Sequence, residues 1–169
     1  MRPYILAAAL ALSPVGAAWA ETPYTADEVV DRLIATVDLG AARAICIGTV
    51  EECAPDPVPG LDMMINFDLD SADLRPDALQ TLAVFATALQ DDRLEIARFV
   101  VEGHTDARGG PDYNIDLSER RAAAVAGHLV GLGVERERIT ARGLGLTAPR
   151  TDDPLDAENR RVELRLTLE

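Results

Sequence analysis

The spacing of hydrophobic residues after residue 60 changes from the period of a strand to the period of a helix. Met63, Ile65 and Phe67 fall on one face of an alternating pattern, which is typical of a half-buried strand. Pro76 suits the first turn of a helix. The inward positions expected for that helix are Leu79, Leu82, Ala83, Ala86 and Leu89. The sequence therefore predicts a strand followed by an amphipathic helix.

The same succession then repeats and ends in two strands. We expect a strand over residues 96–103, a helix over about residues 115–132 and a strand over residues 138–142. In the last strand, strict alternation places on one face Val162, Leu164, Leu166 and Leu168. The predicted fold class is α+β, a two-layer sandwich of order β-α-β-α-β-β with two main helices on one face of a mixed sheet.

Residues 1–20 have the composition of a secretory signal peptide. A basic start at Arg2 precedes an apolar run from Ile5 to Leu12, and Ala18-Trp19-Ala20 matches the small-residue cleavage pattern. The alternative, an uncleaved anchor, is disfavoured because proline and glycine interrupt the run within the length that a membrane span needs. No cysteine follows the expected cut directly, so we expect no lipid attachment there. The expectation is an exported protein, in the periplasm or at the outer membrane.

Residues 21–60 are expected to form an N-terminal segment before a domain that spans residues 61–169. Thr25 with Glu28 is a capping-box pattern, and apolar residues then recur at helical spacing up to Gly40. Three prolines between Ala54 and Gly60 predict a stiff linker and a domain boundary. The apolar stripe of the helix leads to the hypothesis that this segment docks on the domain or on another envelope protein.

Two cysteines, Cys46 and Cys53, are separated by six residues. An oxidising compartment favours a local disulfide between them, and two free thiols are the alternative. Zinc is disfavoured because the two histidines, His104 and His128, lie far from the cysteines in sequence and on different expected elements. We expect neither a metal nor a cofactor.

The chain is strongly acidic, and this limits its partners. The formal net charge is −13, and removal of Arg2 with the signal peptide leaves 15 basic against 29 acidic residues, a net charge of −14. Such a surface repels a polyanion, so nucleic acid is excluded as a partner. About 150 residues remain after the expected cut, which is the length of one domain.

An acidic and a basic side chain in the middle of the chain are expected to lie near one site. Asp106 closes the strand that ends in Gly103-His104-Thr105, and Arg121 lies on the apolar stripe of the following helix. A buried guanidinium needs an anion or several carbonyl oxygens. Two interpretations remain open from these residues: Asp106 or loop carbonyls satisfy Arg121 internally, or both side chains face a shared pocket in which Thr105 and Asn114 add neutral hydrogen bonds.

The order of motifs from Leu61 to Glu169 resembles the OmpA-like C-terminal domain. The residues that carry the resemblance are Gly103-His104-Thr105-Asp106, Gly109, Tyr113-Asn114, Leu117-Ser118, Arg121-Ala122, Val125, Leu129, Gly133-Val134, Arg138-Ile139, Gly143-Leu144-Gly145, Pro149 and Asn159-Arg160-Arg161-Val162-Glu163. The resemblance implies non-covalent binding of peptidoglycan through the meso-diaminopimelate of its stem peptide.

In that resemblance each expected site residue has a role toward the ligand. Asp106 would hold the ammonium group and Arg121 would bind the carboxylate through a bidentate fork. Thr105 and Asn114 would position the ligand. Arg161 would close the pocket, and a structural role for Arg161 is the alternative.

Two other classes of function are alternatives to binding. Ser118, His104 and Asp106 contain the residue types of a hydrolase, but His104 and Asp106 lie two positions apart and Ser118 has no nucleophile-elbow motif. Glu102 and Asp106 are carboxylates of the kind that glycosidases pair, but nothing else in the sequence supports that role. We therefore expect no enzyme. The remaining alternative is a structural envelope scaffold that binds an outer-membrane or periplasmic protein. In that alternative Asp106 and Arg121 form an internal ion pair.

Overall fold

A computed structural model describes residues 23–41, 60–68 and 70–167. The expected signal peptide and the expected Cys46–Cys53 disulfide lie outside these residues. Among the residues described, no helix is both long enough and apolar enough to cross a membrane.

Three helices and four strands make up the regular structure of these residues. In chain order they are α1 (Ala26–Ala41), β1 (Leu61–Asp62), α2 (Pro76–Leu89), β2 (Arg98–His104), α3 (Pro111–Gly131), β3 (Ile139–Gly145) and β4 (Val162–Thr167). Short 3-10 helices are η1 (Asp92–Leu94), η2 (Arg136–Arg138) and η3 (Ala157–Asn159). From β1 to β4 the order is the predicted β-α-β-α-β-β.

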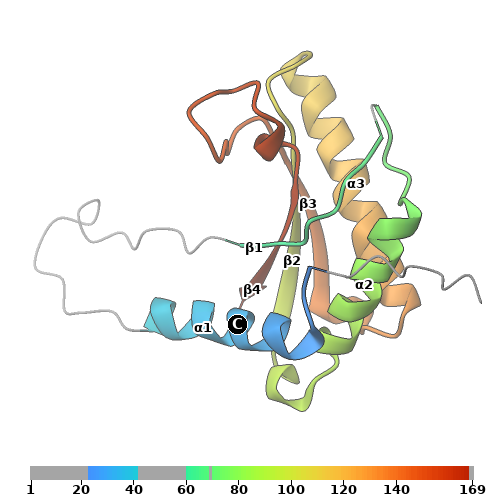
Figure 1. The fold of residues 1–169 in the computed structure, drawn as a ribbon, viewed down its shortest axis with the longest axis vertical. Coiled ribbons are helices and arrows are strands. Elements are labelled where there is room, and N and C mark those ends of the chain that lie inside the picture. Colours follow the sequence, from blue (N-terminus) through green and yellow to red (C-terminus); the bar gives the residue numbers. More distant parts are fainter. Residues whose placement is uncertain (1–22, 42–59, 69, 168–169) are drawn as a thin grey trace, which may run out of the picture.

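The strands form one mixed sheet of order β1-β4-β2-β3. β2 and β3 are parallel and are joined through α3, whereas β4 runs antiparallel to both β2 and β1. Helices α2 and α3 lie together on one side of the sheet (Figure 1). The α+β fold class and its mixed sheet are therefore confirmed.

Alternation along the strands separates an apolar face from a polar face. The core between the helices and the sheet contains the fully or almost fully buried Leu82, Phe85, Leu89, Phe99, Val101, Val125, Leu129, Val162 and Leu164. Each large side chain buried in this way stabilises the fold by roughly 2 kcal/mol. The opposite face of β2 and β4 carries charged side chains, and it is described with the site below.

Two details of the predicted pattern were wrong. The first strand ends at Asp62 and does not reach Phe67, because Met64 adopts a φ of 53° that breaks the ladder after the Met63 amide has bonded to the carbonyl oxygen of Val162. In α2, Leu79 is 38% exposed and Ala83 is exposed, whereas Phe85 is fully buried. The helix packs against both α1 and α3, and this rotates its buried stripe towards Phe85.

Helix α1 begins with the predicted capping box and shares the core of the domain. The Thr25 amide donates to Glu28 Oε2 at 2.8 Å, and the Glu28 amide donates to Thr25 Oγ1 at 3.3 Å. Val29, Val30 and Leu33 are at most 1% exposed. The helix packs on α2 and across one end of β4 (Figure 1), so this part of the N-terminal segment docks on the domain itself.

Candidate ligand-binding site

The site lies where β2 ends and α3 begins. After His104 the chain leaves the sheet, and the Thr105 amide donates to the carbonyl oxygen of Gly145 at 2.9 Å. Gly103 and Gly143 allow α3 to lie unusually close to the sheet, because a Cβ at Gly103 would be 2.3 Å from the carbonyl oxygen of Ser118. This close approach brings the first turns of α3 beside the end of β2.

Asp106 is only 5% exposed and is surrounded by cationic groups. Its Oδ2 accepts from Arg108 Nη1 at 2.6 Å and from Arg160 Nη1 at 2.7 Å, and its Oδ1 accepts from the Arg108 amide at 3.1 Å. Burial opposes ionisation of this carboxyl. The hydrogen bonds from Arg160 and Arg108 outweigh burial and hold the pKa of Asp106 below its usual range, so the group is a carboxylate at neutral pH.

Arg121 is 6% exposed, and carbonyl oxygens satisfy part of its guanidinium. Nε donates to the Ser71 carbonyl at 2.9 Å and Nη2 to the Asp68 carbonyl at 3.3 Å, while the group lies 4.9 Å from the ring centroid of Phe67. Burial lowers the pKa of Arg121, but an arginine stays charged at any physiological pH. No described carboxylate forms an ion pair with it, so Asp106 and Arg121 are not the internal pair of the scaffold alternative.

Both side chains line one pocket with a volume of about 540 Å³. The lining residues come from four segments of the chain: Phe67, Asp68 and Asp70 after β1; Thr105, Asp106, Arg108 and Gly109 after β2; Tyr113, Asn114, Leu117 and Arg121 on α3; and Arg160 before β4. We name this the Asp106–Arg121 pocket. Its walls carry three carboxyl groups, three guanidinium groups and two aromatic rings. Asp68 is paired with Arg75 and Asp70 accepts from the Tyr113 hydroxyl, whereas Asp106 is held by arginines of the pocket itself.

Thr105 and Asn114 lie in this pocket, as expected. Asn114 Nδ2 donates to the carbonyl oxygen of Arg108 at 3.0 Å, which fixes the loop after Asp106. Thr105 Oγ1 is buried and has no hydrogen-bond partner within the described part of the chain. A buried hydroxyl in that state is ready to donate to or accept from a ligand or a water molecule.

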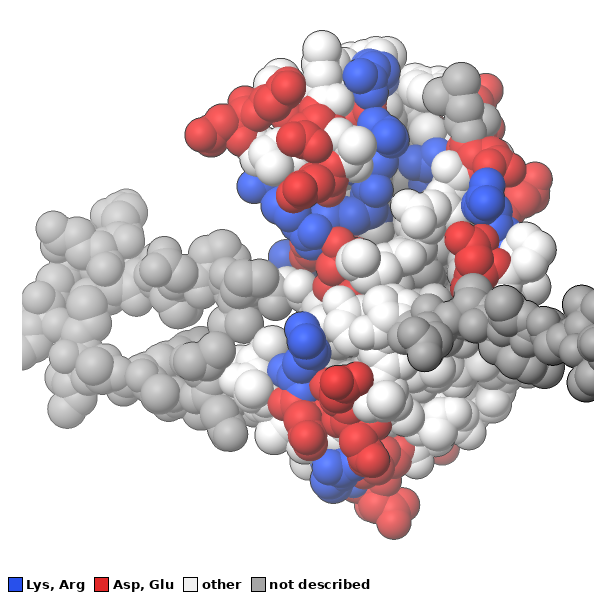
Figure 2. All heavy atoms as spheres, viewed as in Figure 1, with Lys and Arg blue, Asp and Glu red and all other residues white. Residues whose placement is uncertain are grey.

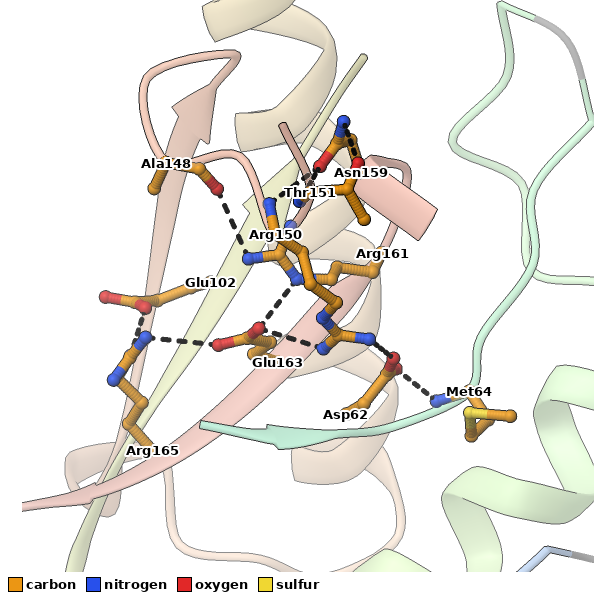
Figure 3. A network of polar contacts seen from close by, with 10 residues as sticks. All are labelled: Asp62, Met64, Glu102, Ala148, Arg150, Thr151, Asn159, Arg161, Glu163 and Arg165. Atoms are coloured by element: carbon orange, nitrogen blue, oxygen red, sulfur yellow. Dashed lines mark hydrogen bonds and ion pairs between the residues drawn. The ribbon is translucent and has the colours of Figure 1, made fainter. Parts of the chain in front are cut away.

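Arg161 does not lie in the Asp106–Arg121 pocket, and the neighbouring Arg160 does. Arg161 Nε donates to Glu163 Oε1 at 2.6 Å and Nη2 donates to the Ala148 carbonyl at 3.3 Å (Figure 3). The alternation of β4 explains the difference, because Arg161 has the parity of Glu163 and points to the polar face, whereas Arg160 has the parity of Val162. This parity was visible in the sequence.

The polar face of the sheet is a network of paired charges (Figure 3). Glu102 and Glu163 are directly opposite each other on β2 and β4, and Arg165 bonds to both. Burial opposes the ionisation of Glu163, but hydrogen bonds from Arg161 and Arg150 hold the pKa of Glu163 below its usual range. The guanidinium groups therefore offset the repulsion between two buried carboxylates.

His104 lies beside this network, and neither of its buried ring nitrogens bonds to a described residue. Together with Glu102 and Glu163 it forms a group of residue types that can bind a metal ion. Within the described residues, ligand atoms of Glu102, His104 and Glu163 lie within 4.8 Å of one another. Arg161 and Arg165 already use oxygen atoms of the two carboxylates, so a cation would have to displace them and would meet their positive charge. This arrangement is better suited to a structural network than to a metal site.

Two residues of the hydrolase alternative have structural roles. Ser118 is fully buried, donates from Oγ to the Ile115 carbonyl at 2.8 Å and accepts from the Gly145 amide at 2.9 Å. Its hydroxyl therefore joins α3 to β3. Glu102 is held by Arg165 on the polar face, whereas Asp106 lines the Asp106–Arg121 pocket.

Asn159 does not line the Asp106–Arg121 pocket, but it holds the segment that carries Arg160. It is 1% exposed, its Oδ1 accepts from the Arg150 amide at 2.7 Å, and its Nδ2 donates to the Asp153 carbonyl at 2.8 Å. These bonds brace the loop between β3 and β4. The loop in turn places Arg160 beside Asp106.

Comparison with known proteins shows which family this chain belongs to. Residues 66–163 match the model of the OmpA family. The chain is 42% identical over 102 residues to the peptidoglycan-associated lipoprotein of Pseudomonas aeruginosa, covering 59% of each chain. It is 38% identical over 108 residues to the outer-membrane lipoprotein YfiB of the same species, covering 62% of this chain and 63% of YfiB. The match thus spans about three fifths of the length of these curated relatives.

Solved structures give the same result for the fold. The crystal structure of the peptidoglycan-associated lipoprotein from Burkholderia pseudomallei superposes with a TM-score of 0.54 at 31% identity, covering 61% of this chain and 88% of that one. The OmpA-like domain of FopA1 from Francisella tularensis also gives a TM-score of 0.54, at 29% identity and with 61% and 71% coverage. The region matched by the family model, residues 66–163, contains every residue that lines the Asp106–Arg121 pocket.

Proposed function

The chain belongs to the OmpA family, and from the geometry of its pocket we propose that it binds peptidoglycan non-covalently through the meso-diaminopimelate of the stem peptide. One observation carries the proposal. An ionised Asp106 and a charged Arg121 face the same pocket and are not paired with one another. A ligand with an ammonium and a carboxylate at one end complements these two groups.

Arg121 is the anchor for the carboxylate in this proposal. Its Nε and one hydrogen of Nη2 are used by the Ser71 and Asp68 carbonyls, and no described residue accepts from Nη1. Nη1 and the second hydrogen of Nη2 can therefore form a fork with a carboxylate. The two carbonyl bonds and the Phe67 ring fix the guanidinium plane before the ligand arrives. A preformed donor loses little conformational entropy on binding, which favours affinity.

Asp106 is the anchor for the ammonium group. In the free protein Arg108 and Arg160 occupy its Oδ2, and their side chains are 61% and 43% exposed. Exposed arginine side chains exchange partners at little cost. The ammonium of the ligand therefore replaces one guanidinium, and Thr105 and Asn114 orient the rest of the zwitterion from the pocket wall.

The proposal also includes a location in the periplasm and binding without catalysis. Two relatives are named as peptidoglycan-associated or outer-membrane lipoproteins, and residues 1–20 have the pattern of a signal peptide, so we place the protein in the periplasm. The buried Ser118 hydroxyl and the paired Glu102 support binding without hydrolysis. A protein partner in the envelope remains a hypothesis from the sequence.

Co-sedimentation with purified diaminopimelate-type sacculi tests the proposal. The wild-type protein should pellet with sacculi, whereas Asp106→Asn and Arg121→Ala should remain in solution after circular dichroism has shown that both are folded. Arg120→Ala is the matched control, because Arg120 neighbours Arg121 on α3 but pairs only with Asp116 among the described residues. A wild-type protein that stays in the supernatant would disprove peptidoglycan binding.

A further inference from the structure

A second pocket lies beside the Asp106–Arg121 pocket, and Arg160 lines both. Its volume is about 440 Å³, and it is bounded by the segment after β1 and by the loop before β4. The two pockets also meet along consecutive residues, since Asn66 lines the second pocket and Phe67 lines the first. We name the second one the Arg160 pocket.

The Arg160 pocket has more hydrogen-bond donors than it uses. Arg160 binds Asp106 through Nη1, and its Nε and Nη2 have no partner in the part of the chain that the structure describes. Asn66 is exposed, and no described residue bonds to its side-chain amide. In contrast, the Asp62 carboxylate in the wall is already bound to Arg150 at 2.6 Å. Glu158 also lines the pocket, and no described residue bonds to its carboxylate. The free groups are therefore the donors of Arg160 and Asn66 together with this one carboxylate, and the donors can receive a ligand that brings acceptors.

Positive charge around this pocket is fixed in place. Arg150 binds both Asp62 and Glu163, and Arg161 binds Glu163, so two guanidinium groups are held in the wall by carboxylates behind them. In Figure 2 blue arginine side chains gather beside the acidic loop that precedes β4. An acceptor that enters here meets preformed donors, as a carboxylate requires.

We propose that the Arg160 pocket is a second subsite, which receives a carboxylate or amide carbonyl of the peptide that is attached to the diaminopimelate. This inference rests on the proposed function, because a diaminopimelate in the cell wall is joined to further residues whose chain has to leave the first pocket. Arg160 then lies between the two parts of the ligand. It contacts the zwitterion site through Asp106 and the attached peptide through its remaining nitrogens.

Two probes separate the subsites in a calorimetric titration of the full chain: free meso-diaminopimelate and a stem tripeptide that contains it. Ala157 is exposed and lines the Arg160 pocket only, so Ala157→Trp fills that pocket and leaves the first one intact. We expect this variant to bind the tripeptide about five- to tenfold more weakly and the free amino acid unchanged, which is the loss of one or two hydrogen bonds. Asn66→Ala should act in the same direction without adding bulk.

Ala123→Trp is the matched control, because Ala123 is exposed on α3 and lines neither pocket. It should bind both probes like the wild type. The subsite is disproved if Ala157→Trp and Asn66→Ala bind the tripeptide as tightly as the wild type does, or if they weaken both probes equally. A wild-type protein that binds neither probe instead disproves the proposed function, and the subsite with it.

Discussion

Asp106 and Arg121 face one pocket from a strand end and a helix, and each is held by groups other than its counterpart. Arg108 and Arg160 bind the carboxylate, and loop carbonyl oxygens bind the guanidinium. The acid and the base are therefore positioned without neutralising each other. This separation leaves room for a zwitterion, and it determines how substitutions at Arg121 should behave.

Replacing Arg121 by lysine should weaken binding of diaminopimelate even though the charge is kept. A lysine ammonium cannot bond both the Ser71 and Asp68 carbonyls and still present a fork to a carboxylate. We expect a loss of affinity of about tenfold or more, or about 1.4 kcal/mol. Calorimetric titration measures it, with Arg120→Lys as the control that should bind normally. Equal affinities for Arg121→Lys and the wild type would contradict the bidentate role.

Acidification should destabilise the protein through His104. Burial, and then the charge of Arg161, lower the pKa of His104 from 6.5 to about 4, although Glu163 and Glu102 act in the opposite direction. The unfolded chain binds more protons than the folded one between these two pH values, so stability is full above pH 6.5 and falls as the pH approaches 4. The loss reaches about 3 kcal/mol at most.

Urea unfolding at several pH values across that interval measures the effect. His104→Gln should remove most of the dependence on pH, because glutamine does not titrate. His128→Gln should retain it, since His128 is half-buried on α3 outside the network. If His104→Gln and the wild type lose stability in parallel, another group is responsible.

The glycines under α3 should be intolerant of a methyl group. A Cβ at Gly103 would lie 2.3 Å from the carbonyl oxygen of Ser118, and one at Gly143 would lie 2.4 Å from Glu119 Cγ. Gly103→Ala should therefore reduce the free energy of unfolding by about 1–3 kcal/mol or more, because the backbone of α3 has to move. Thermal unfolding checks this value.

Gly127→Ala is the control for that substitution. Gly127 lies on α3, and a Cβ there would meet nothing within 4 Å. Because alanine favours the helix over glycine, this variant should be about 0.5–1 kcal/mol more stable than the wild type. A Gly103→Ala protein as stable as the wild type would show that α3 does not need its close approach to the sheet.

Removing Arg165 should expose the repulsion between Glu102 and Glu163. These carboxylates are opposite each other on β2 and β4 and are 6% and 4% exposed. Arg165→Met should therefore destabilise the protein by about 3 kcal/mol. The double variant Glu102→Gln with Arg165→Met should recover much of that loss, because it removes one of the two charges. Chemical denaturation of the single and double variants measures the recovery, and none at all would argue against the repulsion.

The sequence predicted the sheet and its helices well and the local exceptions poorly. Alternation in β4 and the helical spacing in α3 are repeated over many residues, so a few deviations do not hide them. The end of β1 at Asp62 depends on the φ of Met64, and the buried stripe of α2 depends on its packing between α1 and α3. Neither the φ of Met64 nor the packing of α2 can be read from the spacing of hydrophobic residues.

For the site, the sequence determined the chemistry and the tertiary structure decided the geometry. Periodicity placed Thr105 and Asp106 at one strand end and Asn114 and Arg121 on one helix, and the resemblance to the OmpA-like domain implied a site for a zwitterion. Alternation into β4 already indicated that Arg160 and Arg161 point to opposite faces, but only the loop braced by Asn159 brings Arg160 beside Asp106. Arg160 and Asp106 are 54 residues apart in the sequence, and Arg121 and Ser71 are 50 residues apart. Only folding brings such groups within hydrogen-bonding distance.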